Sequence, residues 1–472
     1  MRTAMPRWAR LAISALMLVA GCATHRRAPA SGEAGTALRG VWIVDVETGN
    51  VLAGRTVLIR GSRIVAILPA GDAGVPRGTT MIDGRGKYLI PGLWDMHVHS
   101  AVGARDEFPI YLALGVTGVR NMHTTVDTAL ELSGSIRRQV AAGTLLGPRF
   151  VANGAVVDGP RPAQPGSVPI GAPGAADRII DSLKRGGAEF VKVYNLLPRD
   201  VYFAVLEAAK ARGLVVAGHI PVTVRAEEAA AAGQRSVEHL DGLDFACSTR
   251  EDSIRADFLA RPSREAWYRR GDGLTATWSA EQCGAAIVAY ARHRTWQAPT
   301  LAVAWGEAAV DSVLLDAAAM ATLPATVAER WRGMVADPSH PPDPFARRRL
   351  AQAIATVRLL HAAGVPILAG SDTGNPFVIP GHALHRELEL LVESGLTPLA
   401  ALQAATVNPA SYLEMTDSLG SIEAGQLADL VLLDANPLTD IRHTRGIFAV
   451  VRNGLYLDRA ALDAMLAGTG AR

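Results

Sequence analysis

Two histidines separated by one residue close an apolar segment early in the chain. The segment runs from Leu93 to His99 (LWDMHVH) and follows the pair Pro91-Gly92. Residues i and i+2 of a β-strand point to the same face, so the imidazoles of His97 and His99 are expected to project together. Imidazole nitrogens are common ligands of zinc and similar divalent ions. The pair therefore predicts part of a metal site at the end of a strand.

A lysine lies inside another segment that is predicted to be a buried strand. Lys192 occurs in the run FVKVYN, in a chain whose basic residues are almost all arginines. A lone buried ammonium is costly and tends to lose its proton, and a neutral lysine can react with carbon dioxide to give a carbamate. The two carbamate oxygens could bridge two cations, which arginine could not do because it stays protonated. The alternative is a structural lysine that pairs with a carboxylate of the fold.

Three further side chains that can bind metals close later apolar segments. His219 ends the run VVAGH, His239 ends SVEH, and Asp372 ends ILAGSD. Taken singly, each histidine fits a hydrogen-bonded core residue, and Asp372 fits a helix cap. Because four histidines and a buried lysine share the predicted strand ends, we interpret Asp372 as a metal ligand, whereas His219 and His239 remain candidates for either role. Asp372 is also the expected proton shuttle.

Other side chains near these strand ends are candidates for contact with substrate. Tyr194 lies two residues after Lys192 and should face the same way, so that its phenol could bind a developing oxyanion or a substrate carboxylate. His123, at the end of the second predicted strand, could do the same. Either could instead be a rim residue without a catalytic task. Arg120 is a weaker candidate, and His382 and His385 are expected on a helix surface.

Eight apolar segments of strand length alternate with helical patterns, which is typical of a parallel sheet. Eight such units over roughly 310 residues fit a (β/α)8 TIM-type barrel with insertions, in which active-site residues lie at the carboxyl ends of the strands. The longest gap between strands, 241–297, is expected to hold extra helices that could cover the site. The predicted strands are Leu93–Val98, Val116–Met122, Phe150–Val157, Phe190–Asn195, Val215–Ile220, Ser236–Leu240, Ala298–Val303 and Val365–Asp372.

Both ends of the chain beyond this region are β-rich. Thr56–Arg60 and Arg63–Leu68 flank Gly61-Ser62, a hairpin signal, and short apolar runs return at 429–433, 449–451 and 455–457. We expect a small β-sandwich built from the two chain ends. The predicted organisation is a signal peptide at 1–21, a lipidated tether at 22–37, β-sandwich parts at 38–91 and 411–472, and the barrel at 92–410.

The composition allows a large core and gives no electrostatic signal for nucleic acid. Of the 472 residues, 49% are hydrophobic and 19% charged, which excludes global disorder. The formal net charge is +2 and aromatic residues make up 5%, so neither a basic surface nor a set of base-stacking side chains is expected. No nucleic-acid partner is predicted.

The first residues resemble an export signal that ends in a bacterial lipobox. A basic start precedes the short apolar run Leu11–Ala20, which is far below the ~20 residues of a membrane span. The run VAGC ends at Cys22, so we expect cleavage before Cys22, its lipidation, and membrane association on the periplasmic face of the cell envelope, with the outer membrane favoured. An ordinary signal with a chance cysteine is the alternative.

Cys247 and Cys283 could form a disulfide or remain two buried thiols.

The ordered set of strand-end residues resembles the amidohydrolase superfamily, in its binuclear-metal branch with a carbamylated lysine. The runs LIPG before His97 and GSIEAGQLADL at 420–430 resemble the ends of that family's barrel. The subset that is most similar comprises exported imidazolonepropionase-like and Xaa-Pro or Xaa-Arg dipeptidase-like proteins. The resemblance implies two divalent metal ions with these ligands: His97, His99 and Asp372 for the first, His219 and His239 for the second, and carbamylated Lys192 between them.

Zinc is the expected metal, although the ligand types also permit manganese or cobalt. The resemblance implies a hydroxide that bridges the two metals and attacks the substrate, with Asp372 as general base and then acid.

The sequence departs from the motifs of this family at two places. Asn121 and His123 replace an acid and a small residue of the dipeptidase-like motif on strand two. His219 is followed by Ile-Pro-Val rather than by the HxxE of deaminases, which counts against nucleobase deamination.

The leading functional hypothesis is a metal-dependent hydrolase of carbon–nitrogen bonds, including peptide bonds, that acts on a small amide such as a dipeptide or an N-acyl amino acid. A second hypothesis keeps the metals but cleaves an ester, a lactone or a phosphotriester. A third is an envelope binding protein without catalysis. The sequence leaves the oligomeric state open, with a homo-oligomer among the options.

Overall fold

The computed structural model describes residues 35–69, 71, 73–123, 129–261, 264–339 and 343–470. The described residues belong to one compact unit. The predicted signal peptide, the lipidation site Cys22 and most of the predicted tether lie outside the described residues. Within those residues, no helix combines the length and apolar character that a membrane crossing requires.

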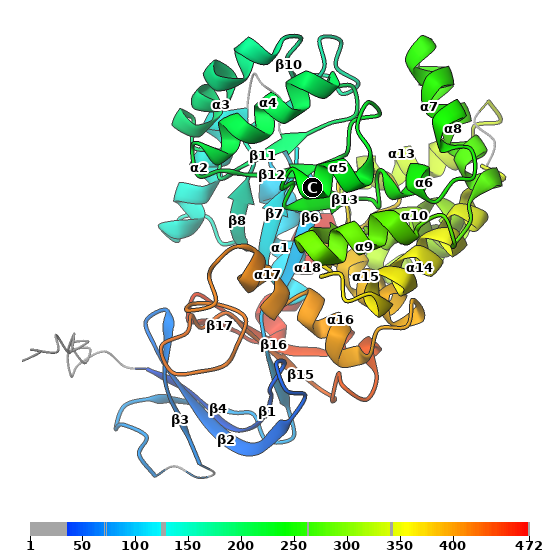
Figure 1. The fold of residues 1–472 in the computed structure, drawn as a ribbon. Coiled ribbons are helices and arrows are strands. Elements are labelled where there is room, and N and C mark those ends of the chain that lie inside the picture. The colour runs from blue at the N-terminus through cyan, green and yellow to red at the C-terminus, as the bar shows by residue number, and fades with distance from the viewer. Residues whose placement is uncertain are drawn as a thin grey trace, which may run out of the picture. The chain divides into compact units, whose positions relative to one another are not determined.

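The two chain ends contribute to one eight-stranded mixed sheet (Figure 1). Its spatial order is β17, β16, β15, β5, β1, β2, β3, with β4 beside β1. The predicted hairpin is confirmed: β2 and β3 pair antiparallel around Gly61, whose φ is +53°. The strands are β1 (Thr36–Val44), β2 (Val51–Arg60), β3 (Arg63–Leu68), β4 (Thr80–Asp83), β5 (Tyr88–Pro91), β15 (Leu430–Leu433), β16 (Ile447–Arg452) and β17 (Leu455–Leu457).

The middle of the chain forms parallel strands in two hydrogen-bonded groups, β6-β7-β8 and β10-β9-β11-β12-β13-β14. Six predicted strands are found at or near their expected positions, and the third is divided into β8 and β9. The strands are β6 (Leu93–Val98), β7 (Val116–Asn121), β8 (Arg149–Ala152), β9 (Val156–Asp158), β10 (Val168–Pro169), β11 (Phe190–Val193), β12 (Val215–Gly218), β13 (Ser236–Glu238) and β14 (Trp296–Ala298).

The seventh and eighth predicted strands need correction. The seventh, β14, ends at Ala298, and most of the predicted Ala298–Val303 segment turns at Thr300 (φ +49°) into a helix. A short apolar run cannot tell a buried strand from a buried helix. The eighth segment, 365–372, forms no regular strand, although Leu368 N donates to the Gln297 carbonyl (2.8 Å) and Met96 N donates to the Ala369 carbonyl (2.9 Å). The segment therefore lies between β14 and β6 and connects them.

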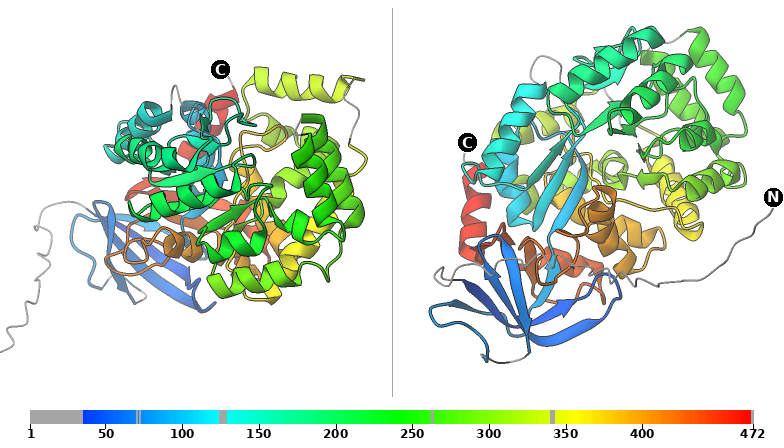
Figure 2. Two further views of the ribbon diagram at one scale, coloured as in Figure 1. Left: turned by 45° about the horizontal axis from the view of Figure 1, so that its top comes forward. Right: turned by 60° about the vertical axis from the view of Figure 1, so that its left-hand side comes forward.

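Helices flank the parallel strands (Figures 1 and 2), which gives a TIM-barrel-like α/β arrangement. Most strands are followed by at least one helix, as expected for this architecture. The helices up to the long insertion are α1 (Ala104–Ala113), α2 (Ala129–Ala141), α3 (Ala176–Arg185), α4 (Arg199–Lys210) and α5 (Ala226–Ala231). Those after β14 are α10 (Leu301–Ala308), α11 (Val310–Leu315), α12 (Ala317–Met320), α13 (Ala325–Ala336), α14 (Ala346–Ala362), α15 (His382–Glu393), α16 (Pro398–Ala404), α17 (Val407–Tyr412) and α18 (Arg459–Gly470).

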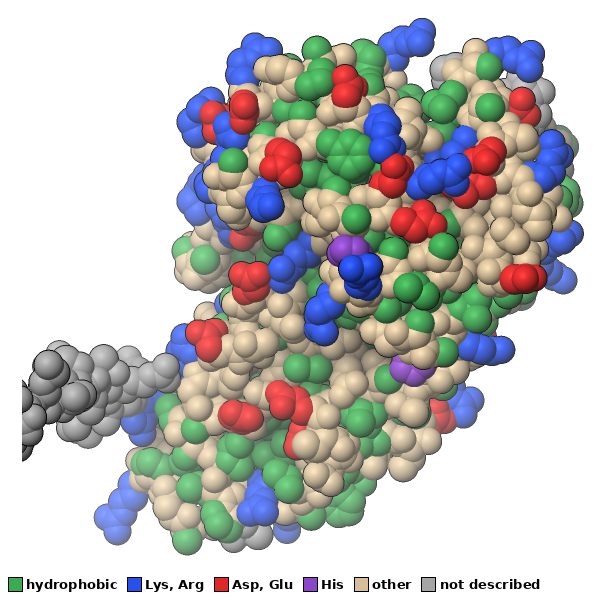
Figure 3. Space-filling view, viewed as in Figure 1, with side chains coloured by type: hydrophobic (Ala, Val, Ile, Leu, Met, Phe, Trp, Pro, Cys, Tyr) green, Lys and Arg blue, Asp and Glu red, His purple; other side chains and the backbone are tan. Residues whose placement is uncertain are grey.

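The described residues of the insertion between β13 and β14 form four helices, where the sequence predicted extra helices without a number. They are α6 (Leu243–Ala246), α7 (Glu251–Ala260), α8 (Arg264–Thr277) and α9 (Gly284–His293). A disulfide joins Cys247, just after α6, to Cys283, just before α9, which resolves the alternative left open by the sequence. On the face of the molecule in Figure 3, basic and acidic side chains are interspersed.

Candidate active site

The predicted ligands of the first metal meet where β6 ends. His97 is fully buried on β6, and His99 lies one residue past its end with 26% of its side chain exposed. The Oδ1 atom of Asp372 is 2.8 Å from His99 Nε2 and 3.3 Å from His97 Nε2. Two neighbouring histidines and an aspartate more than 270 residues later in the sequence therefore converge on one point.

The other predicted ligands surround the same point. The ring of His239 lies 4.5 Å from that of His97 and 5.0 Å from that of His219, centroid to centroid. His97, His239 and Asp372 offer potential ligand atoms that all lie within 4.8 Å of one another. A cavity of about 270 Å³ opens here, and Lys192 lines it together with His219 and His239. Five of the six predicted ligands thus line one cavity, and the sixth, His97, is buried beside it against Asp372.

Three histidines are oriented by polar groups outside the cavity. In each case the Nδ1 atom lies within hydrogen-bond distance of an outer partner, which leaves Nε2 for a metal ion. These pairs are His97 with Glu238 Oε2 (3.0 Å), His219 with Asn195 Oδ1 (2.8 Å) and His239 with Thr300 Oγ1 (2.7 Å). The Nε2 atom of His97 is buried and has no hydrogen-bond partner among the described residues. A buried nitrogen without a partner beside a carboxylate fits a metal ligand, so the donor set suits a divalent cation.

Lys192 occupies β11, almost completely buried. Burial lowers the pKa of its ammonium to about 8, although the nearby carboxylates of Glu238 and Asp372 oppose this shift. A substantial neutral fraction near neutral pH would make the amine able to react with carbon dioxide. On the neighbouring strand, a Cβ atom at Gly218 would lie 2.9 Å from Lys192 Cδ and 2.3 Å from the Val193 carbonyl. The glycine before His219 therefore provides space for the lysine side chain.

Asp372 has an unusual backbone conformation, with φ at +62°. Burial alone would raise the pKa of its carboxyl, but the neighbouring imidazoles of His239 and His99 hold it below its ordinary value. Glycines on both sides allow a close approach to the strand of the histidines: a Cβ at Gly370 would lie 2.9 Å from His97 Cβ, and one at Gly374 would lie 2.6 Å from His99 Cβ. The segment GSDTG is thus shaped to hold an ionised carboxylate against two imidazoles.

Arg120, a weak catalytic candidate from the sequence, has a different place. Its side chain is fully buried behind the cavity, where Nη2 lies 2.9 Å from Glu238 Oε2 and Nε donates to the Met96 carbonyl over 2.6 Å. It does not line the cavity. Arg120 instead neutralises Glu238, the residue that orients His97. Sequence reasoning missed Glu238, although an acidic residue inside a predicted buried strand, beside His239, was an available signal.

The two candidate substrate-contacting residues do line the cavity. The Tyr194 ring lies 4.1 Å from the His219 ring, and the His123 ring lies 5.6 Å from the His99 ring. Burial raises the pKa of Tyr194 to about 12 and lowers the pKa of His123 to about 4, so both groups are neutral near pH 7. Tyr194 accepts a hydrogen bond from Gln164 Nε2 (2.9 Å), a residue that the sequence did not single out.

Asn121, which replaces an acid of the dipeptidase-like motif, acts on the loop after β6. Its Oδ1 atom accepts hydrogen bonds from the backbone N–H groups of Ser100 (2.9 Å) and Ala101 (3.1 Å). It therefore fixes the chain directly after His99.

The expectation that His385 lies on a helix surface is wrong. His385 is 1% exposed, and its ring nitrogens lie 2.9 Å from Thr444 Oγ1 and 3.0 Å from the Leu114 carbonyl. His382, at the start of the same helix, is partly buried.

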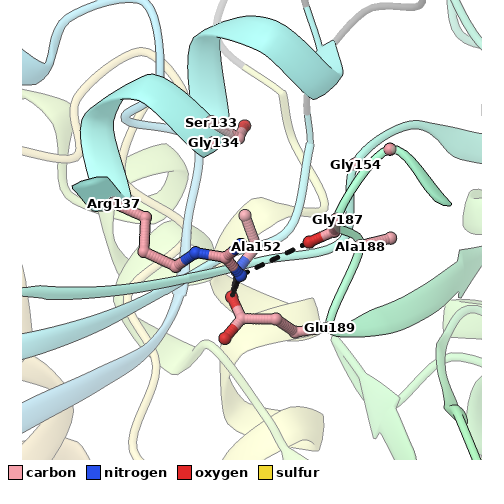
Figure 4. Close-up of a pocket in the computed structure, with 9 residues that line it drawn as sticks. Ser133, Gly134, Arg137, Ala152, Gly154, Gly187, Ala188 and Glu189 are labelled. Carbon is pink, nitrogen blue, oxygen red and sulfur yellow. Dashed lines mark hydrogen bonds and ion pairs between the residues drawn. The ribbon is translucent and has the colours of Figure 1, made fainter. Parts of the chain in front are cut away.

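A second, much smaller cavity lies between α2 and the segment before β11 (Figure 4). There Arg137 Nη1 donates to the Gly187 carbonyl (3.4 Å) and lies 3.2 Å from Glu189 Oε2. Its volume of about 10 Å³ is near the minimum for one water molecule, so it is no substrate site. The larger cavity, with the six converging side chains, is the candidate active site.

Comparisons with known proteins agree with this geometry. The amidohydrolase family model matches residues 88–455. Adenine deaminase 3 of Rhizobium meliloti (strain 1021) is 25% identical over 457 residues, which cover 90% of this chain and 59% of the deaminase. The chain thus spans less than two thirds of that relative's length.

Two solved structures are similar in fold. The bottromycin amidohydrolase has a TM-score of 0.72 at 23% identity, covering 93% of this chain and 91% of its own. A Xaa-Pro dipeptidase with bound methionine in its active site has a TM-score of 0.66 at 22% identity, covering 90% of this chain and 100% of its own. Since the family model spans most of the chain, the protein belongs to the amidohydrolase family.

Proposed function

We propose that the protein is a metal-dependent hydrolase that cleaves a carbon–nitrogen bond in a small amide or peptide-like substrate. The observation that carries this proposal is the cavity of about 270 Å³ that His99, His219, His239, Asp372 and Lys192 line, with His97 buried beside it against Asp372. A cavity of this size suits a small molecule rather than a polymer chain buried along its length.

The proposed site holds two divalent ions, with zinc as the expected metal. The first would be held by His97, His99 and Asp372, and the second by His219 and His239, with Lys192 as a bridging carbamate. When bound, such ions lower the pKa of a coordinated water and polarise a substrate carbonyl. The support for these assignments is the short distance from Nδ1 to a polar partner at His97, His219 and His239, which leaves each Nε2 atom for a metal ion.

Asp372 is the proposed proton shuttle. Its Oδ1 atom lies against the two imidazoles at the end of β6, which leaves Oδ2 to accept a proton from the attacking water. The depressed pKa keeps the carboxylate ionised and ready to act as a base. The same proton can then pass to the departing amine nitrogen, which leaves poorly without it. His123, whose ring lies 5.6 Å from that of His99, would donate a hydrogen bond to the oxygen that becomes negative, and Tyr194, which lines the same cavity, would contact another oxygen of the substrate.

A substrate panel tests the proposal. Metal-loaded protein is offered dipeptides, N-acyl amino acids, cyclic amides, lactones and adenine, and metal content is measured in parallel. We expect close to two ions per chain and hydrolysis of at least one amide. The Asp372→Asn variant should lose about 10²–10⁴-fold in kcat, whereas Asp417→Asn, an exposed aspartate elsewhere, should not.

Other results of this panel would contradict the proposal. Turnover of lactones without any amide would favour the esterase-type alternative. Turnover of adenine alone would favour the activity named for the Rhizobium relative. Protein that binds no metal, even with bicarbonate supplied, would argue against the catalytic site itself.

We also propose an exported, lipid-anchored location and the finer architecture expected from the sequence. The disulfide between Cys247 and Cys283 supports export, because disulfides persist in oxidising compartments. Cys22→Ser should release the protein from the membrane fraction, and unchanged retention would refute the lipid anchor.

We further propose that the parallel strands close into a (β/α)8 barrel over 92–410, and that the mixed sheet of the chain ends folds as a β-sandwich (38–91 and 411–472). The hydrogen bonds of segment 365–372 to both β14 and β6 support closure.

A further inference from the structure

Gln164 lines the same cavity as Tyr194 and reaches it from the loop between β9 and β10. Its side-chain nitrogen Nε2 donates to the phenolic oxygen of Tyr194 over 2.9 Å. An amide N–H is only a donor, so the phenol is the acceptor in this bond and its own O–H proton must point elsewhere. Because both side chains border the cavity, that proton is available to an oxygen atom of a bound molecule.

The loop that carries Gln164 is held in place by one buried carboxylate, Asp158 at the end of β9. This carboxylate accepts from three backbone N–H groups, those of Gly159, Ala163 and Leu196, each at 2.8 Å. Leu196 lies two residues beyond Tyr194, so Asp158 ties the loop of Gln164 to the segment of Tyr194. The hydrogen-bonded pair therefore rests on a fixed backbone, which favours a recognition role over a chance contact.

Other residues that line the cavity beside the proposed ligands carry uncharged groups. Met122 and Val156 contribute apolar surface, and Asn375 contributes an amide. Proteins usually bind a substrate carboxylate with arginine or lysine, through charge-assisted hydrogen bonds. Among the described residues that line the cavity, the one such side chain is Lys192, which the proposed function assigns to the metals.

We propose that Gln164 directs the Tyr194 hydroxyl toward the substrate as a neutral donor, and that this donor, with no cationic side chain beside it among the described lining residues other than Lys192, favours substrates whose group here is an uncharged carbonyl or carboxamide rather than a carboxylate. The inference rests on the proposed function and narrows its substrate class to neutral amides. Gln164 is in this sense a positioning residue, and Tyr194 is the group that touches substrate.

Matched ligands that differ only in charge test this. Zinc-loaded protein is given N-acetyl-L-alanine or N-acetyl-L-alaninamide, and cleavage of the acetyl–nitrogen bond is followed by mass spectrometry. We expect kcat/KM to be at least about tenfold higher for the amide, mainly through a lower KM. In parallel, calorimetry measures the binding of two analogues that cannot be cleaved, 2-methyl-4-oxopentanoate and its carboxamide. In both analogues a methylene replaces the scissile N–H of the corresponding substrate. The carboxamide should bind about tenfold more tightly.

Two variants with the same charge change separate the pair from general electrostatics. Gln164→Lys places an ammonium beside the phenol and should shift the preference toward the carboxylate ligand by about tenfold or more. Gln282→Lys, at an exposed position outside the cavity lining, should leave the preference unchanged. Equal melting temperatures show that both variants fold.

The outcomes distinguish the inference from the proposed function. If neither substrate is cleaved although two metals are bound, the proposed function fails for N-acyl amino acids and their amides. The binding of the two uncleavable analogues still decides the charge preference. Equal or tighter binding of the carboxylate by the unmodified protein overturns the inference. An unaltered preference in Gln164→Lys overturns the role of Gln164.

Discussion

The Nδ1 atom of His97 lies 3.0 Å from the Oε2 atom of Glu238, although 141 residues separate them in the sequence. The same carboxylate accepts from Arg120 and from the hydroxyl of Ser236 (2.6 Å), all inside the fold. A carboxylate that accepts the Nδ1 proton fixes the histidine tautomer with Nε2 free for a metal. The ion pair behind the cavity is thus part of the proposed metal centre.

Glu238→Gln should weaken metal binding by about 10–100-fold. The amide offers one acceptor oxygen where the carboxylate offers two, so His97 and Arg120 must compete for it. Metal affinity is measured by competition with a chelator. Glu207→Gln, on the exposed side of α4, is the control and should bind metal normally. Unchanged affinity in Glu238→Gln, with the fold intact, would show that this hydrogen bond does not orient the ligand.

Lys192→Ala should lose the bridging ligand and with it most of the bound metal and turnover. A short carboxylic acid such as propionate should restore part of both, because it can supply two oxygens in the space left by the side chain. Metal content and activity are followed against acid concentration. Lys210→Ala, an exposed lysine on α4, should behave like the unmodified protein. Full activity of Lys192→Ala without added acid would refute the bridging role.

Gly218→Ala should displace the Lys192 side chain. The residue has φ of +125°, and an added Cβ would come within 2.3 Å of the Val193 carbonyl and 2.9 Å of Lys192 Cδ. Gly233 also has a positive φ (+90°) but has open space around it, so Gly233→Ala measures the cost of the backbone conformation alone. We expect Gly218→Ala to lower the melting temperature more than this control does, and to reduce metal content per folded chain. Equal effects of the two substitutions would mean that the lysine side chain is not crowded there.

The sequence predicted the residues that point into the site better than the residues that support them. The bounds of β6 and the shared face of His97 and His99 follow from the two-residue period of a strand, a local property. Glu238, Asn195 and Thr300 meet their histidines only through the tertiary fold, so the sequence does not reveal which histidine each one orients, although an acidic residue in a predicted buried strand was a local signal for Glu238.

The errors in the strand assignments have a similar physical origin. The run after Ala298 is apolar throughout, and apolarity alone does not separate a strand from a buried helix. Segment 365–372 forms no regular strand, and it ends with Asp372 at a positive φ beside β6. The pairing of Cys247 with Cys283 depends on the relative position of α6 and α9, which composition does not contain.

Glu387 predicts a specific dependence of stability on pH. It is fully buried on α15, where Oε2 accepts from the backbone N–H of Ala302 (2.7 Å), and burial raises its pKa from the ordinary 4.5 to about 8. Between these values the folded protein holds a proton that the unfolded chain releases. The stabilising contribution is therefore complete below pH 4.5 and is lost as pH rises toward 8, with a slope of at most about 1.4 kcal/mol per pH unit.

The comparison of two glutamines measures this contribution. The side chain in Glu387→Gln cannot ionise, so the free energy of unfolding of this variant should fall less steeply between pH 5 and pH 8 than that of the unmodified protein. The two slopes should differ by close to one proton, which is about 1.4 kcal/mol per pH unit. Denaturant titrations at constant metal concentration measure both slopes. Glu393→Gln, at an exposed position on the same helix, should leave the slope unchanged. If Glu387→Gln retains the original slope, the Glu387 carboxyl is ionised in the folded protein. The start of α10 is then held by a charged rather than a neutral acid. This matters for the site because Thr300, the residue before α10, orients His239.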